Sequence, residues 1–180
     1  MFCRLINITG LLLALVSTPV MALSNDREQP IYIESDELEV DDQQGVSEYR
    51  GSVRFTQGSI QLQADKVVVT EVEQRLQKVM AYGQPAHLRQ LLDDDKGEMR
   101  AIADTMEYLV KDDSLVLHGD AKLWQGGNEF SGEEIIYHLS SETVVARSDK
   151  EQEGRVRIVI QPKVPETRDD SAGEAEASSP

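Results

Sequence analysis

The stretch RGSVRFTQGSIQLQADKVVV, Arg50 to Val69, decides the fold class because apolar and polar residues alternate along it. Val53 and Phe55 are two positions apart, which is the spacing of residues on one face of a strand, and the alternation starts again after Gln57-Gly58. Successive side chains of a β-strand point to opposite faces, so this period of two predicts strands with one apolar face. We interpret Gly51 and Gln57-Gly58 as turns between such strands.

Short strands are predicted from Gln29 to about Val164. A parity change at Ser35-Asp36 predicts a bulge or bend, and Asp41–Gly45 is predicted to form a turn. The contiguous apolar residues Val67–Val69 are compatible with a strand buried on both faces. The chain has no long helical stripe, so we expect an all-β sandwich, jelly roll or barrel. The predicted strands are PIYIES, ELEV, SVRFTQ, SIQLQA, KVVVTEV and QKVMAYG.

The second half of the chain repeats the first after a shift of 68 residues. Apolar parity and turn positions agree in this alignment even where residues differ, which indicates an internal duplication. The aligned pairs are Asp36 with Asp104, Leu38 with Met106, Gly51 with Gly119, Phe55 with Leu123, Gln57-Gly58 with Gln125-Gly126, Leu62 with Phe130, and Val67 with Ile135.

Both ends of the chain differ from this strand-rich region. Residues 1–22 combine Arg4, the short apolar run LLLALVSTPVMA and small residues at the end, which predicts a signal peptide cleaved after Ala22. An uncleaved anchor is the alternative, although the run is short for a membrane span. Residues 165–180 have almost no large apolar side chain, which predicts a disordered acidic tail. We therefore expect one β-domain over residues 23–164, with an exposed loop at Asp93–Glu98.

Charge and cysteine content exclude several classes of function. The net charge of −15 disfavours nucleic acid, whose phosphates require Lys and Arg, and also disfavours adhesion to an anionic membrane. The only cysteine, Cys3, lies in the predicted signal peptide, so no disulfide is expected after cleavage.

Motifs for catalysis or metal binding are missing from the sequence. His87, His118 and His138 are scattered singly, and DDDKGE lacks the glycine and glutamate spacing of a calcium loop. Glu133 and Glu134 are adjacent on a strand, so they face opposite sides and cannot flank one sugar bond. We expect no enzyme activity, no cofactor and no metal.

Two stretches resemble a known family. QPIYIESDELEV (Gln29–Val40) and GVSEYRGSVRFTQGSIQLQADKVVV (Gly45–Val69) are similar to the OstA-like repeat of periplasmic lipopolysaccharide export proteins. YGQPAHL (Tyr82–Leu88) resembles the segment that follows in that family. The resemblance extends to about Gln161, is strongest up to Thr70 and is looser in the second repeat.

The resemblance implies an open, twisted antiparallel β-jelly roll in the periplasm without catalysis. Such a protein would shield the acyl chains of lipid A in an apolar groove and carry lipopolysaccharide between the inner and outer membranes. It would assemble head to tail with itself, with an inner-membrane-anchored LptC-like protein at one end and an outer-membrane LptD-like protein at the other.

Strand parity and the resemblance together give candidate site residues, although each of them is also compatible with a place in a closed core. The candidates for lipid contact are Ile31, Ile33, Phe55, Leu62, Leu88, Met106, Tyr108 and Val110. The candidates for subunit joining are Ile31, Ile33, Val156, Ile158 and Ile160. Two other functions stay open: an adaptor or chaperone that binds partner strands without carrying lipid, and a carbohydrate-active enzyme on a jelly-roll scaffold.

Overall fold

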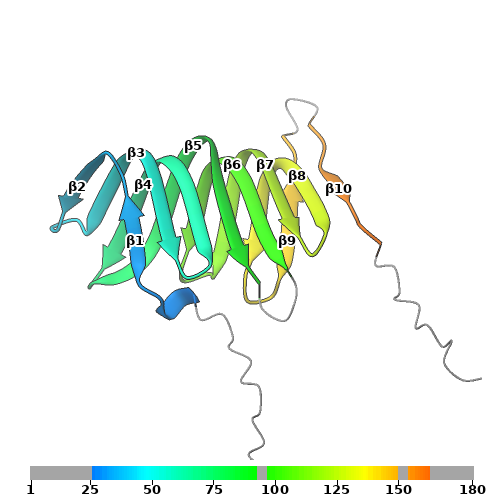
Figure 1. Ribbon diagram of the computed structural model, residues 1–180. Helices are drawn as coiled ribbons and strands as arrows, with labels where there is room; N and C mark the ends of the chain where they lie inside the picture. The colour runs from blue at the N-terminus through cyan, green and yellow to red at the C-terminus, as the bar shows by residue number, and fades with distance from the viewer. Residues whose placement is uncertain (1–25, 93–96, 150–153, 163–180) are drawn as a thin grey trace, which may run out of the picture.

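Six long strands form the body of the protein in the computed structural model, which describes residues 26–92, 97–149 and 154–162 (Figure 1). Each long strand pairs antiparallel with the next one along the chain. The predicted signal peptide, the acidic tail and most of the Asp93–Glu98 loop lie outside the described residues. The long strands are β3 (Val46–Gln57), β4 (Ile60–Val72), β5 (Arg75–Leu91), β6 (Glu98–Leu109), β7 (Ser114–Gln125) and β8 (Asn128–His138).

Short strands complete the sheet at both ends. At one end β1 (Ile31–Glu34) and β2 (Glu37–Asp41) both pair with β3, after a 3-10 turn η1 (Asp26–Glu28). At the other end β9 (Thr143–Arg147) and β10 (Arg157–Val159) both pair with β8. Within the described residues the two ends do not pair with each other, so the sheet stays open. The prediction of an open, all-β antiparallel fold is confirmed.

The prediction of many short strands was wrong in the body of the sheet. SVRFTQ belongs to the 12-residue β3, and SIQLQA and KVVVTEV join in the 13-residue β4. The pairing register shifts inside these strands, between Arg50 and Val53 in β3 and between Gln63 and Lys66 in β4. Gly51 therefore lies in a bulge and not in a turn, because a bulge bends a strand without ending its pairing. The predicted turn at Gly58 and the break at Ser35-Asp36 are confirmed.

The bulges divide the sheet into two half-sheets, which we call wall 1 and wall 2, joined along a crease. All six long strands bend at the crease, so each contributes one segment to each wall. Wall 1 consists of β1, β10 and residues 53–57, 60–64, 86–91, 98–103, 121–125 and 128–132. Wall 2 consists of β2, β9 and residues 46–50, 66–72, 75–82, 105–109, 114–118 and 134–138.

The crease shows the internal duplication directly. The register shift between Arg50 and Val53 recurs in the second repeat between His118 and Ala121. At each of these bulges a glycine has a positive φ, 83° at Gly51 and 78° at Gly119. The side chains of Asp36 and Asp104 pack against these two glycines, as the 68-residue alignment pairs them. The same bulge, with a glycine of positive φ packed against an aspartate, therefore occurs once in each repeat.

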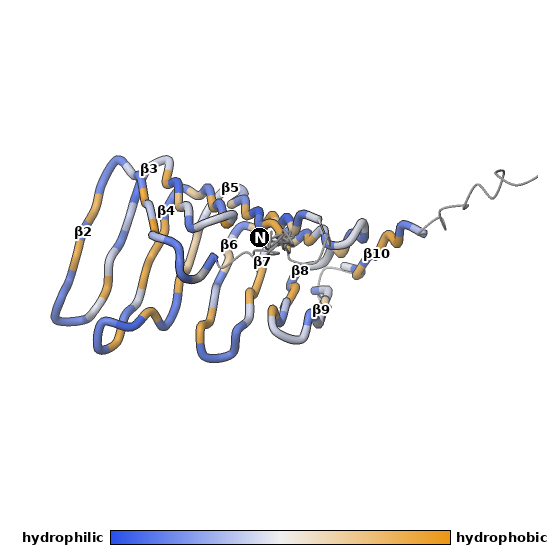
Figure 2. Tube along the Cα trace, turned by 60° about the horizontal axis from the view of Figure 1, so that its bottom comes forward, coloured by the Kyte–Doolittle hydropathy of each residue, from blue (hydrophilic) through white to orange (hydrophobic). Residues whose placement is uncertain are grey.

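The buried apolar side chains of both walls point into the space between them, and Figure 2 shows the alternation of apolar and polar residues along the strands. Val67, Leu117 and Ile135 are fully buried there. The prediction that Val67–Val69 is buried on both faces was wrong. Val68 points to the outer face of wall 2 and is half-buried, since no second layer covers that face in the described part of the chain.

Candidate functional site

The space between the walls contains a cavity of about 150 Å³ with mainly apolar lining. Both walls contribute, because their inward rows meet across it. No Asp, Glu, Lys, Arg or His side chain lines it among the described residues. Its lining consists of Phe55, Gln57, Ile60, Leu62, Leu88, Gln90 and Met99 from wall 1, and Leu76, Val79, Ala81, Met106, Tyr108, Leu115 and Leu139 from wall 2 and its end.

The cross-strand register shows that this cavity is part of a longer groove. Residues directly opposite one another on neighbouring strands have their side chains on the same face. In wall 1 one inward row crosses the whole sheet from β1 to β10: Ile33, Phe55, Leu62, Leu88, Ala101, Leu123, Phe130 and Ile158. In wall 2 a facing row runs from β2 to β9: Val40, Ser47, Val69, Val79, Tyr108, Leu115, Tyr137 and Val144.

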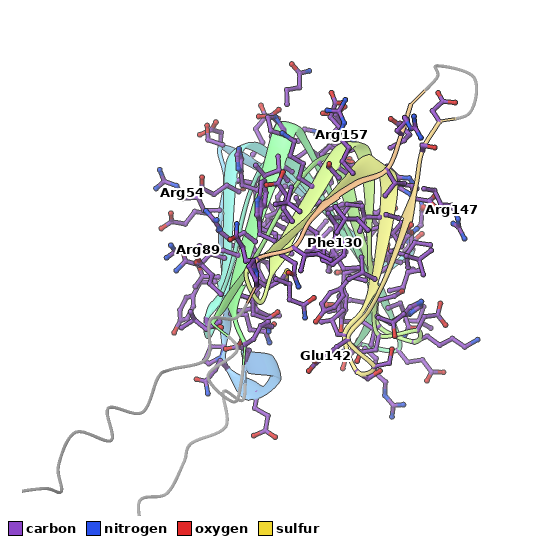
Figure 3. The ribbon with its side chains drawn as sticks, turned by 90° about the vertical axis from the view of Figure 1, so that its right-hand side faces the viewer. Arg54, Arg89, Phe130, Glu142, Arg147 and Arg157 are labelled. Atoms are coloured by element: carbon purple, nitrogen blue, oxygen red, sulfur yellow. The ribbon has the colours of Figure 1, made fainter. Side chains whose placement is uncertain are left out.

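Figure 3 shows this arrangement from the β10 end. Phe130 lies between the two walls, Arg54 and Arg89 point away from wall 1, and Arg147 points away from the opposite wall. The groove is therefore apolar inside, and its outer faces carry charged side chains.

The structure brings five of the eight predicted lipid-contact residues together around the cavity: Phe55, Leu62, Leu88, Met106 and Tyr108. Ile33 packs against the same core from β1. Ile31 and Val110 do not line the cavity and are exposed. Whether any of the eight contacts lipid stays a prediction.

Sequence reasoning missed several residues of the cavity, including Ile60, Val79 and Met99. Their parity marks them as inward-facing, but parity does not show which inward positions border a gap. It also missed the glutamines. Gln125 Nε2 of wall 1 donates a hydrogen bond to the Tyr137 hydroxyl of wall 2 at 2.9 Å and thereby links the walls near the β8 end.

A buried carboxylate holds the N-terminal segment at the edge of wall 1. Asp26 in η1 accepts hydrogen bonds from Ser59 N and Ser59 Oγ, both at 2.7 Å, and from Gln90 Nε2 at 3.1 Å. Ser59 lies in the β3–β4 turn, and Gln90 lines the cavity. The side chain of Asp26 therefore ties η1 to two strands of the groove.

The outer faces carry ion pairs. Glu48 contacts both Arg50 and Lys66, and Glu107 contacts Lys78. The hydrogen bond that Arg50 donates to Glu48, together with the negative charge of Glu48, raises the pKa of the Arg50 guanidinium above its ordinary value, and Glu39 adds to this. These groups are solvent-accessible, so their contribution to stability is small.

The predicted joining residues lie at the two open ends of the sheet. Ile31 is 48% exposed in β1 at one end, and Ile158 is 53% exposed in β10 at the other. Ile160 follows β10 and is 72% exposed. Ile33 and Val156 are half-buried. An edge strand presents unpaired backbone groups, to which another strand can add.

Other kinds of site were searched for in the same residues. The described part of the chain contains no cluster of three His, Cys, Asp or Glu side chains that could hold a metal ion. None of its helices is long and apolar enough to cross a membrane.

Comparison with known proteins identifies the family of this chain. Residues 32–161 match the family described as LptA/(LptD N-terminal domain) LPS transport protein. The chain belongs to this family. The resemblance seen in the sequence is thereby confirmed, and membership supports a function in lipopolysaccharide transport.

Individual members of the LptA/LptD N-terminal family are similar over most of the chain. "Lipopolysaccharide export system protein LptH" of Pseudomonas aeruginosa is 40% identical over 162 residues, which cover 87% of this chain and 93% of LptH. LptA of Escherichia coli K12 is 38% identical over 148 residues, covering 81% and 78%. A crystal structure of LptH, described as the LptA homologous periplasmic component of the lipopolysaccharide transport device from Pseudomonas aeruginosa, superposes with a TM-score of 0.68 at 36% identity. The match covers 76% of this chain and 99% of that one.

Proposed function

We propose that this protein carries lipopolysaccharide across the periplasm with the acyl chains of lipid A held in the groove between the walls. The observation that supports this most directly is the apolar row that runs uninterrupted by charge from β1 to β10 in wall 1. A groove open along the sheet suits a long apolar ligand. Membership in a family of lipopolysaccharide transport proteins supports lipopolysaccharide as that ligand.

Physical chemistry explains why such a carrier is needed. Each buried methylene contributes about 0.8 kcal/mol, so one long acyl chain in water costs on the order of 10 kcal/mol. Several chains on one lipid make unassisted crossing of an aqueous gap prohibitive. Apolar contact has no direction, so a chain can slide along the groove without breaking a specific bond.

The walls are expected to separate when lipid enters. The cavity of about 150 Å³ is smaller than the roughly 300–1,000 Å³ of ordinary ligand pockets. Among the described residues only side chains fill the groove opposite the crease, and a polar link such as Gln125–Tyr137 can be exchanged for water. The ligand therefore replaces wall-to-wall contacts with wall-to-lipid contacts.

Head-to-tail joining would extend the groove between the membranes. The β1/β2 end and the β9/β10 end are different surfaces, so a contact between them is heterologous and repeats along one axis. Addition of strands at such edges is a common mode of recognition. An LptC-like protein at the inner membrane and an LptD-like protein at the outer membrane would occupy the two free ends. Residues 23–180 would form this periplasmic protein after cleavage of the leader.

Transfer of lipid in solution tests the proposal. Protein of residues 23–180 is mixed with a tagged family member loaded with lipopolysaccharide, the two are separated on the tag, and the lipid in each fraction is measured. We expect lipopolysaccharide to appear on the untagged protein. If the proteins associate but lipid stays on the donor, the adaptor function is favoured instead, and release of sugar fragments would indicate an enzyme.

A further inference from the structure

A second hollow lies on the outer face of wall 1, opposite the groove. Its volume is about 280 Å³, and its lining includes Gln61, Gln63, His87, Arg89, Arg100 and Trp124. The register places Gln61, Arg89, Arg100 and Trp124 directly opposite one another on four neighbouring strands, β4 to β7. These side chains therefore form one continuous outward row.

Two arginines face each other in this row, although the chain as a whole has a net charge of −15. Like charges on directly opposite residues destabilise a sheet. Glu98 is near both guanidinium groups, at 3.9 Å from Arg89 and 3.8 Å from Arg100. Glu98 and Glu129, which lies opposite Trp124 at the end of the row, balance the two formal charges. Glu98 shares one carboxylate between two guanidinium groups, so both groups keep hydrogen-bond donors for a ligand.

The remaining contacts fix the geometry of the hollow and leave guanidinium groups accessible. Arg89 Nε donates to Gln61 Oε1 at 3.0 Å, which orients the guanidinium and leaves its terminal nitrogens facing solvent and Glu98. Arg100 lies over the Trp124 ring, 5.4 Å from the ring centroid. Trp124 Nε1 donates to Glu129 Oε2 at 3.0 Å, which fixes the plane of the ring.

We propose that Arg89, Arg100 and Trp124 form a second binding site, for an anionic saccharide that carries phosphate or carboxylate groups. Guanidinium groups bind such oxyanions through paired, charge-assisted hydrogen bonds. An indole ring packs against the apolar C–H face of a sugar, and the amides of Gln61 and Gln63 can bond its hydroxyl groups. A flat acidic protein surface fits the site less well, because it would contact the arginines but would neither fill the hollow nor pack on the aromatic ring.

The saccharide has two possible sources. Arg89 lies two residues before the end of β5 and Arg100 two residues after the start of β6, so the hollow reaches the free edge of wall 1, around which a lipid bound in the groove can extend. The site could therefore hold the sugar part of a lipid bound in the groove, or a separate glycan of the cell envelope. The shared requirement is an anionic sugar.

Trp124 is the only tryptophan of the chain, so its fluorescence reports on this hollow alone. The probe is a deacylated, phosphorylated oligosaccharide prepared from lipopolysaccharide, titrated at physiological ionic strength, with calorimetry in parallel. We expect saturable binding, and at least tenfold weaker binding of a neutral oligosaccharide of the same length. The double variant R89Q/R100Q should bind at least tenfold more weakly, whereas R54Q, a matched arginine on the same outer face, should stay within twofold of the unmodified protein.

Absence of binding heat, equal binding of the neutral sugar, or an equal loss in R54Q would overturn the proposal. Circular dichroism confirms that the variants fold, which is expected because the Arg89 and Arg100 side chains are more than half exposed. The probe has no acyl chains, so a negative result leaves the groove untouched. If intact lipopolysaccharide changes Trp124 emission and lipid A alone does not, the sugar belongs to the bound lipid. If the free oligosaccharide binds but bound lipopolysaccharide does not change Trp124 emission, the saccharide comes from a separate glycan.

Discussion

A glycine and an aspartate in each repeat fix the crease on which the groove depends. A Cβ at Gly51 would lie 2.2 Å from Asp36 Oδ2, and one at Gly119 would lie 2.6 Å from Asp104 Oδ2. The amide of Asp36 also donates to the carbonyl groups of Arg50 and Gly51. Only glycine combines this close approach with a positive φ at low cost.

Replacement of Gly51 by alanine should therefore be costly. We expect G51A to lower the free energy of unfolding by about 2–4 kcal/mol, since it adds both a clash and an unfavourable φ. The control G126A has a φ of 56° but nothing within 4 Å of its Cβ, so it should cost only about 1 kcal/mol. Urea unfolding measures both values, and equal losses would show that the Asp36 contact does not matter.

The carboxylate of Asp26 should protect the β3–β4 turn. In D26A, Ser59 loses both of its hydrogen bonds to this side chain. Hydrogen bonds to a charged group contribute about 2 kcal/mol, so the Ser59 amide should exchange its hydrogen roughly 30 times faster. The neighbouring exposed Glu28, changed to alanine, provides the control. Unchanged protection of Ser59 in D26A would contradict this role.

At the scale of elements, the sequence predicted where strands occur but not how long they are. Alternation is local, so SVRFTQ and SIQLQA were recognisable without tertiary information. Whether a glycine ends a strand or bends it depends on pairing with a distant partner, here Asp36 against Gly51. A short stretch of sequence does not contain that information, so the sequence alone predicts a turn at Gly51 where the structure has a bulge.

The two open ends of the sheet lead to a prediction about assembly. I31R places a charge on the β1 end, and I160R places one beside the β10 end. Each variant alone should associate at least tenfold more weakly, whereas a mixture should form dimers but nothing longer, because one intact end remains on each partner. V72R is the control: Val72 is 56% exposed at the end of β4, which is not an edge strand. Sedimentation velocity would contradict the model if the mixture stayed monomeric or V72R dissociated equally.

At the scale of the whole molecule, the lining of the groove could be predicted only in part. Phe55, Leu62 and Tyr108 follow from parity, because inward positions alternate along each strand. Alternation along a strand does not show how far apart the two walls stand, so it does not separate Tyr108, which lines the cavity, from Val110, which lies outside it, and it missed Met99. The polar link Gln125–Tyr137 joins residues from different walls and has no local signature.

The proposed function depends on one property of the whole fold: neighbouring residues of a strand lie on different faces of the sheet, one toward the groove and one toward solvent. Tyr108 lines the groove, while the preceding Glu107 faces outward and pairs with Lys78. Ile33 packs against the core, while the following Glu34 lies beside Arg54 on the outer face. The two residues of each pair are adjacent in sequence, but their side chains lie on opposite faces of the sheet.

Site-specific photo-crosslinking at these four positions tests the central claim most directly. A photoreactive phenylalanine is placed singly at residues 33, 34, 107 and 108, each protein is loaded with lipopolysaccharide and irradiated, and the adducts are quantified. We predict at least tenfold more lipopolysaccharide adduct from positions 33 and 108 than from 34 and 107. Adducts of equal yield on both faces, or none from positions 33 and 108, would contradict a groove that carries the lipid between its walls.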